Sequence, residues 1–236
     1  MTGAPTGRRR RARPPQLERS DIIDTALVLV DADGLDALTM RALATRLGVY
    51  PTALYWHVGS KAQLLAAVSA LVLERIELPP DHDTTWDRWL VDVAHLCRNA
   101  MHRHPNLAPV IGSQLVVSTT ALPFVERILR VLEQLGLDSE DLLHVYNTVI
   151  GCVLGWITLE LSRPPEDEED GWQDGYADEL QAVHGTAYPM LTRHHKLMAN
   201  NAFLTRWQSG EERPMDASFA AAIEVLVAGV RARYLS

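Results

Sequence analysis

The sequence is poor in cysteine and has no long uninterrupted hydrophobic run. Its two cysteines, Cys97 and Cys152, lie far apart, which excludes a disulfide framework and a CxxC metal knuckle. No apolar run reaches the ~18 residues that a membrane span needs. The first residues carry arginines in place of the apolar core of a signal peptide. We therefore expect a cytoplasmic protein that does not cross a membrane.

The sequence motifs of common enzyme classes are also missing. We find no GxSxG, HExxH, P-loop or GxGxxG in a suitable context. Six of the nine histidines form pairs or near-pairs, namely His102 and His104, His194 and His195, and His82 and His95. The first two pairs do not share a helix face, and a metal site needs convergent ligands. We expect no enzyme activity, no metal and no cofactor.

Positive charge is concentrated at the N-terminal end of an acidic chain. The 236 residues carry a net charge of −8, yet residues 1–80 hold ten Lys and Arg against eight Asp and Glu. Residues 81–236 hold twelve against twenty-two, and residues 1–13 contain five arginines and no acid. A basic N-terminal segment followed by an acidic remainder of the chain is typical of nucleic-acid-binding proteins. The alternative for the arginine-rich tail is a disordered, solubilising arm.

Hydrophobic periodicity predicts an all-α protein with about nine or ten helices. Apolar residues recur at helical spacing from Ser20, a predicted N-cap, to Gly34, and from Thr39, a second N-cap, to Gly48. Further helices are predicted over 51–58, 60–77, 86–101, 123–135, 139–162, 187–199 and 215–234. The chain is predicted to divide into a disordered basic arm (1–16), a first helical domain (17–78) and a second helical domain (79–236). An acidic loop is expected at 163–178.

Residues 39–61 form the most informative segment. Two short helices meet at Gly48, and the second presents Tyr55, Trp56 and His57 consecutively. A helix of two turns cannot bury three adjacent bulky side chains, so some of them must face solvent as a contact surface. A short helix after a glycine turn on a helical support is typical of a helix-turn-helix, whose second helix enters the DNA major groove.

The segment from about Ser20 to Leu65, with the string TALYWHV followed by Lys61 and two leucines, resembles the DNA-binding domain of the tetracycline-repressor (TetR) family. Residues 142–161 and 219–235 resemble the C-terminal domain of the tetracycline-repressor branch. The resemblance implies a transcriptional repressor that binds a palindromic operator in double-stranded DNA as a homodimer. It also implies release from DNA by a small-molecule effector. The alternatives are a regulator without a small-molecule ligand, or an activator.

The resemblance implies DNA contacts by nine residues: Thr39, Arg41, Tyr50, Pro51, Thr52, Tyr55, Trp56, His57 and Lys61. Hydroxyl, phenol and cationic groups suit phosphate oxygens, and Arg and Thr can also contact base edges. Tyr50 departs from the family pattern, in which a Ser or Thr commonly caps the recognition helix. Two alternatives remain, that Trp56 is half packed on the support and that Thr39 acts only as a cap.

The C-terminal half is expected to sense the effector and to form the dimer. Candidate ligand-binding residues are Trp89, Val93, Cys97, Ile111, Asn147 and Trp156, with simple core packing as the alternative for each. Ile111 stands where the tetracycline-repressor branch has a histidine that chelates the drug's magnesium, so we expect a more apolar ligand. The helices 139–162 and 215–234 are the expected interface. Its predicted contacts are Val149, Val153, Ile223, Leu226 and Val230.

Overall fold

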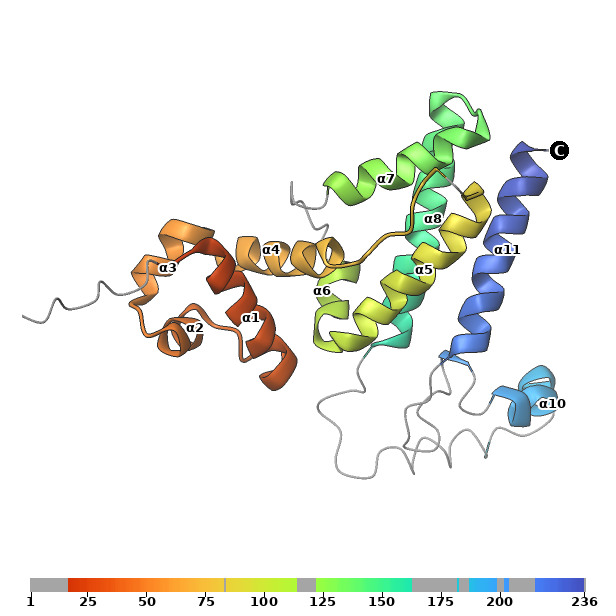
Figure 1. Cartoon of the computed structure of the whole chain (residues 1–236). Coiled ribbons are helices and arrows are strands. Elements are labelled where there is room, and N and C mark those ends of the chain that lie inside the picture. The colour runs from red at the N-terminus through yellow and green to blue at the C-terminus, as the bar shows by residue number, and fades with distance from the viewer. Residues whose placement is uncertain are drawn as a thin grey trace, which may run out of the picture. The chain divides into compact units, whose positions relative to one another are not determined.

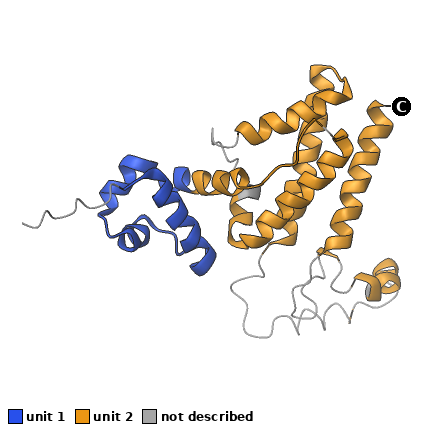
Figure 2. Cartoon of the chain, viewed as in Figure 1, with its two compact units in different colours: residues 1–64 blue, residues 65–236 orange. Residues whose placement is uncertain are grey.

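The chain folds into two compact units, residues 1–64 and 65–236 (Figure 2). A computed structural model describes residues 17–82, 84–113, 122–162, 182, 187–198, 202–203 and 215–235. Within these residues there are ten α-helices and two short 3-10 helices and no strand, which confirms the all-α class (Figure 1). The basic arm 1–16 and the acidic loop 163–178 lie outside the described residues.

Unit 1 consists of three helices and the first turn of a fourth. They are α1 (Arg19–Asp33), α2 (Met40–Leu47), α3 (Pro51–Val58) and the start of α4 (Lys61–Glu74). The first three contact one another. The core of unit 1 contains seven side chains with no exposed surface, namely Ile22, Ala26, Val30, Leu38, Leu43, Leu54 and Leu64. Unit 1 therefore has its own core on which to support exposed residues.

Local backbone chemistry sets the helix ends in unit 1. The expected N-cap at Ser20 is wrong: α1 begins at Arg19 with Glu18 as its N-cap, because the Asp21 carboxylate accepts the Glu18 N–H at 3.2 Å. The other predicted cap is confirmed, since the Thr39 hydroxyl accepts the Ala42 N–H at 3.0 Å. Gly48 ends α2 with φ +68°, a left-handed conformation that favours glycine.

Helix α4 runs continuously across the border between the two units. Ser60 and Gln63 form a reciprocal cap, with the Gln63 N–H on the Ser60 hydroxyl at 3.2 Å and the Ser60 N–H on Gln63 Oε1 at 2.9 Å. The helix ends at Glu74, three residues before the predicted end. The predicted domain border after residue 78 falls in the connection that follows α4.

Unit 2 is a helical bundle built around one long helix. It contains α5 (Trp86–Arg103), η1 (Pro105–Leu107), α6 (Ala108–Ser113), α7 (Leu122–Leu132), η3 (Glu133–Leu135), α8 (Ser139–Glu160), α10 (Pro189–Met198) and α11 (Asp216–Tyr234). Helix α8 contacts α5, α6, α7 and α11, and α5, α8 and α11 lie side by side (Figure 1). The core between them includes Trp89, Ile157 and Phe219.

An ion cluster, buried at Arg98 and Glu160 and exposed at Asp216, joins three helices of unit 2. The Arg98 guanidinium on α5 donates to both oxygens of Glu160 on α8, at 2.7 and 2.6 Å, and to Asp216 on α11 at 2.6 Å. The Met215 N–H donates to Glu160 at 3.0 Å. Burial raises the pKa of Glu160, but the hydrogen bonds from Arg98 and Met215 outweigh it and hold that pKa below its ordinary value.

Candidate nucleic-acid interface

Helix α3 buries one side and presents the other to solvent. Leu54 and Val58, four residues apart, pack into the core of unit 1. Tyr50 is 83% exposed, Tyr55 51% and Trp56 90%, and Thr52 and His57 are also exposed. The alternative that Trp56 is half packed on the support is therefore wrong. Large aromatic side chains exposed in this number on one short helix mark a contact surface.

The N-terminal end of α3 has no side-chain cap. Tyr50 occupies the N-cap position and its side chain makes no capping hydrogen bond, as the departure from Ser or Thr predicts. Pro51 follows at the first helical position, where its missing N–H costs nothing. The first turn contains no acidic residue, so no side-chain charge offsets the positive end of the helix dipole. This end of α3 is suited to a phosphate group.

The segment of chain that forms α2 and α3 carries only positive charge. No acidic residue occurs in the sequence between Asp36 and Glu74. Arg41 on α2 and Lys61 at the start of α4 are exposed, and neither forms an ion pair within the described part of the chain. Arg46 in the last turn of α2 is also exposed and is missing from the predicted contacts. The absence of acids from this stretch is the sequence signal that points to it.

All nine residues expected to contact DNA belong to unit 1, between Thr39 and Lys61. Eight of them are exposed, and Pro51 is half-buried at the start of α3. Thr39 is both a cap, through the Ala42 N–H, and an exposed side chain. The arrangement combines hydroxyls, phenols and cations on a helix-turn-helix, a surface that can bind phosphates and contact base edges.

Three of the candidate ligand residues are core residues of α5. Trp89, Val93 and Cys97 are all buried, with exposures of 0%, 4% and 6%. The Trp89 indole N–H donates to the carbonyl oxygen of Pro79 at 3.1 Å. Burial raises the pKa of the Cys97 thiol to about 12, so this thiol stays protonated and unreactive near neutral pH. The side chain of Ile111 lies outside the described residues.

The two candidates on α8 do not face the same space. Asn147 and Trp156 are nine residues apart, which places them on opposite sides of a helix. Asn147 is exposed and lines a groove of about 550 Å³ between α8 and α11. The ring of Trp156 contacts Phe203 and Phe219, with centroids 4.8 and 6.0 Å away. Its indole nitrogen is buried and has no hydrogen-bond partner within the described residues.

The histidines of the described residues make separate contacts. His102 lies 3.4 Å from the Glu160 carboxylate, His82 lies 3.7 Å from Asp81, and the ring of His95 stacks edge-on against Phe219. Among the described residues, no group of three or more His, Cys, Asp or Glu side chains is placed to hold a metal ion.

An all-helical chain with a helix-turn-helix unit and a separate helical bundle defines the class of one-component DNA-binding regulators. Residues 22–68 match the family described as bacterial regulatory proteins, tetR family. Residues 78–234 match the tetracyclin repressor-like C-terminal domain. The chain belongs to the TetR family of transcriptional regulators.

Similar proteins support this assignment over most of the chain. An HTH-type transcriptional regulator of Saccharopolyspora erythraea is 29% identical over 75% of this chain and 74% of its own length. The class D tetracycline repressor of Escherichia coli is 33% identical over 59% of this chain and 65% of its own length. The structure of the TetR family protein ActR of Streptomyces coelicolor in complex with actinorhodin is 25% identical. It has a TM-score of 0.73 and covers 93% of this chain and 97% of that one.

Proposed function

We propose that this protein is a cytoplasmic transcriptional repressor that binds a palindromic operator as a homodimer and is released from DNA by a small-molecule effector. The observation that carries the proposal is that the acid-free part of unit 1, residues 37–64, exposes Tyr50, Tyr55 and Trp56 together with Arg41 and Lys61. Exposure of large aromatic side chains to water is unfavourable, so their presence together on this surface indicates that it binds a partner.

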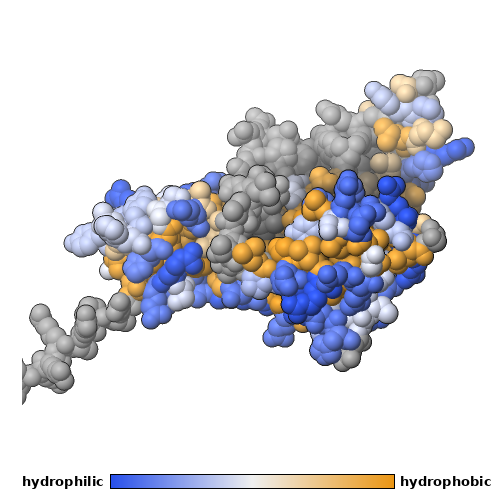
Figure 3. All heavy atoms as spheres, turned by 90° about the horizontal axis from the view of Figure 1, so that it is seen from above, coloured by the Kyte–Doolittle hydropathy of each residue, from blue (hydrophilic) through white to orange (hydrophobic). Residues whose placement is uncertain are grey.

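A second copy is the partner that best fits α8 and α11. Helix α8 is long and apolar enough to cross a membrane by length and composition, but only 22% of that stretch is buried in the protomer. Helix α8 contacts α5, α6, α7 and α11, as the central helix of a bundle does. Its last turn contains Glu160, which pairs with Arg98 in the ion cluster. Hydrophobic residues also reach the surface as a band in the view of Figure 3. A second protomer would cover such residues without a bilayer.

The exposed stripe on each of these helices has small residues at its centre. On α8 it repeats every four residues, through Leu143, Asn147, Gly151, Gly155 and Leu159. On α11 it includes Ala221, Val225 and Gly229. A Cβ atom added at any of the three glycines meets nothing within 4 Å. These glycines are not needed for packing within the protomer, and their size suits close approach by helices of a second copy.

Four of the five predicted interface residues are buried within the protomer. Val149, Val153, Ile223 and Val230 are between 1% and 7% exposed, and Leu226 is half-buried. The two α8 valines and the two α8 glycines have the same spacing, but they lie two residues apart in register. The protomer buries the valine face, which leaves the glycine face for a partner.

Two observations support the effector part of the proposal. The buried Trp156 indole N–H has no partner within the described residues, and a buried donor without a partner is costly. A carbonyl or hydroxyl oxygen of a ligand would satisfy it. In addition, the similar protein ActR binds actinorhodin. We infer a small, largely apolar effector with at least one acceptor oxygen.

Selection of genomic DNA fragments with the full-length protein tests DNA binding. We expect enrichment of a palindrome of about 15–20 base pairs, because the two recognition helices of a dimer bind half-sites about 34–36 Å apart. Enrichment without a shared sequence would contradict operator recognition. A screen in which no small molecule weakens operator binding would leave a DNA-binding regulator that has no effector.

Sedimentation equilibrium of Gly155→Leu tests the dimer. A Cβ atom added at Gly155 meets nothing within 4 Å in the protomer, whereas a leucine side chain would block close approach of a second copy, so we expect a folded monomer. Asn99→Leu, on the exposed side of α5, is the matched control and should remain dimeric. A Gly155→Leu protein that stays dimeric would show that the partner binds elsewhere.

A further inference from the structure

Helix α3 presents an apolar surface on the side that faces solvent. Leu54 and Val58 pack into the core of unit 1. Thr52 and Trp56 each lie two residues from Leu54, a rotation of about 200° around the helix. Trp56 is 90% exposed and the neighbouring Tyr55 is 51% exposed. The exposed side of α3 therefore carries two aromatic rings and a threonine methyl group.

The same helix has no side chain that can contact a purine through two parallel hydrogen bonds. Its sequence, PTALYWHV, contains no Arg, Lys, Asn, Gln, Asp or Glu. In the major groove, Arg and Lys contact guanine in this way, and Asn and Gln contact adenine. The polar groups that α3 does carry are the hydroxyls of Thr52 and Tyr55, the Trp56 indole N–H and the imidazole of His57. None of them can make two parallel hydrogen bonds to one base edge.

The helices beside α3 do not supply a free amide side chain either. Gln63 is the only Asn or Gln in residues 37–73. Its Oε1 atom accepts the Ser60 N–H at 2.9 Å, and its own backbone N–H donates to the Ser60 hydroxyl at 3.2 Å. Gln63 is thus occupied by the N-terminal cap of α4. Recognition of adenine by an amide is therefore not available to this helix-turn-helix.

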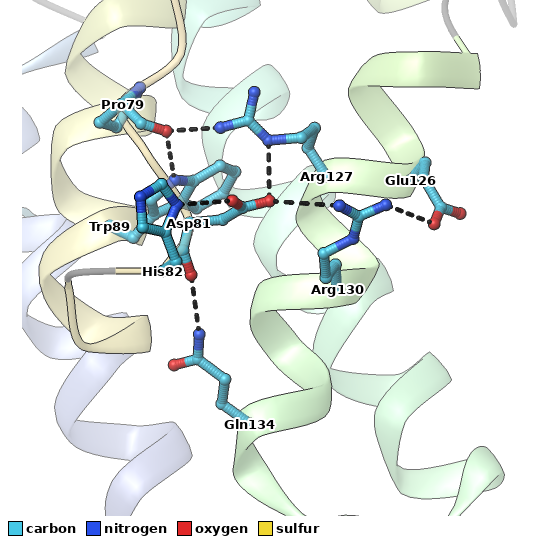
Figure 4. A network of polar contacts seen from close by, with 8 residues as sticks. All are labelled: Pro79, Asp81, His82, Trp89, Glu126, Arg127, Arg130 and Gln134. Carbon is cyan, nitrogen blue, oxygen red and sulfur yellow. Dashed lines mark hydrogen bonds and ion pairs between the residues drawn. The ribbon is translucent and has the colours of Figure 1, made fainter.

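An arginine contacts guanine most specifically when neighbouring groups hold its guanidinium in place. Unit 2 contains two arginines held in this way, since Asp81 Oδ2 lies 3.1 Å from Arg127 Nε and 3.7 Å from Arg130 Nη1 (Figure 4). Residues 37–73 contain no carboxylate that could hold Arg41 likewise. Arg41 is therefore better suited to a phosphate, which positions a protein on DNA and carries no sequence information.

Thymine is the base that matches the exposed side of α3. It alone places an apolar group, the C5 methyl, in the major groove, where apolar side chains can contact it. We propose that α3 recognises its operator chiefly through thymine methyl groups, which contact Trp56, Tyr55 and the methyl group of Thr52. The inference rests on the proposed function, because it names the DNA chemistry that the same surface selects. Since the methyl group decides, 5-methylcytosine, which has its methyl on the same ring atom, should be accepted in place of thymine.

Replacing thymine by uracil in the operator tests this inference, because it removes the methyl group and keeps the base pair. The full-length protein is titrated with the palindrome obtained from the genomic selection, in which one thymine at a time is replaced. We expect affinity to fall by about three- to fivefold for each methyl group that contacts α3, since burial of one methyl group contributes about that factor. Cytosine at a sensitive position should weaken binding, and 5-methylcytosine there should recover part of the loss.

Trp56→Ala connects the effect to α3. The side chain is 90% exposed, so the variant should fold, which its thermal unfolding checks. We expect it to bind the thymine operator more weakly than the wild type and to distinguish thymine from uracil at fewer positions. Lys61→Ala is the matched control, because it removes an exposed cation close to α3 in sequence and leaves the aromatic rings in place. It should weaken binding to the thymine and uracil operators by the same factor.

The possible results separate this inference from the proposed function. Equal affinity of the wild type for the thymine and uracil operators would overturn the inference and leave operator binding in place. Sensitivity to uracil that neither Trp56→Ala nor Tyr55→Ala reduces would overturn the assignment of the methyl contacts to α3. If the selection enriches no sequence, the proposed function fails, and the inference fails with it.

Discussion

Replacing Lys61 by Ala tests the placement of the DNA surface most directly. Lys61 is exposed at the first position of α4, within a stretch from residue 37 to 73 that contains no acid. Each phosphate contact contributes about 0.9 to the slope of log affinity against log salt. A homodimer has two copies of Lys61, so the slope should become shallower by about 1.8. The fold should be unaffected, because the side chain is in solvent.

Fluorescence anisotropy with a labelled fragment from the genomic selection, at salt from about 50 to 200 mM, measures this slope. The only other lysine of the chain, Lys196 on α10, supplies a control of equal charge. Lys196→Ala should leave the slope unchanged. An unchanged slope for Lys61→Ala would remove Lys61 from the phosphate contacts. A change of about 0.9 would mean that one copy binds DNA per complex, which contradicts the symmetric dimer.

Three further predictions concern specificity and stability. Tyr55→Ala should cost about 1–3 kcal/mol at the selected operator and little on random DNA, as measured by competition binding. Glu160→Gln should lower the free energy of unfolding in urea by about 3–5 kcal/mol, because it leaves the buried Arg98 without its main partner. Folding lowers the pKa of Glu160, so its ionised carboxylate should stabilise the wild type at pH values above 4.5, the ordinary pKa. This stabilisation should be lost as the pH falls below 4.5. The Glu160→Gln protein should not show this pH-dependent loss. Gly48→Ala should lower the thermal midpoint, because it adds about 1 kcal/mol of backbone strain at φ +68°. No atom lies within 4 Å of the added Cβ, so a steric clash does not contribute.

The architecture of unit 1 was predictable because its signals are local. Thr39, Gly48 and Pro51 mark helix ends within a few residues of the groups they satisfy, and the structure has all three in those roles. The exposure of Trp56 follows from the same local argument, because a short helix cannot bury Tyr55, Trp56 and His57 together. The error at Ser20 is also local. The reciprocal contact of Glu18 with Asp21 starts α1 at Arg19, one residue before the predicted N-cap.

The contacts of unit 2 depend on residues that are distant in sequence, and periodicity does not reveal them. Arg98 and Glu160 are 62 residues apart, yet they are joined by two hydrogen bonds of 2.7 and 2.6 Å. Helix periodicity shows that α8 has two apolar faces but does not show which one the protomer buries. For this reason Val149 and Val153, which were predicted at the interface, are buried within the protomer instead. The nine-residue spacing of Asn147 and Trp156 already places them on opposite faces of α8, but only the neighbours of α8 show which of the two lies against the bundle.

The division of charge along the chain gives the two units different relations to DNA. Residues 81–236 carry a net charge of −10, which repels phosphate and disfavours non-specific binding of DNA to unit 2. At physiological salt this repulsion is screened within about 8 Å, so it acts on DNA that touches the acidic surface and little beyond it. The attraction of Arg41, Arg46 and Lys61 is also local. An acidic chain can therefore bind DNA because the sign of the charge within a Debye length of α3, and not the net charge, decides the interaction.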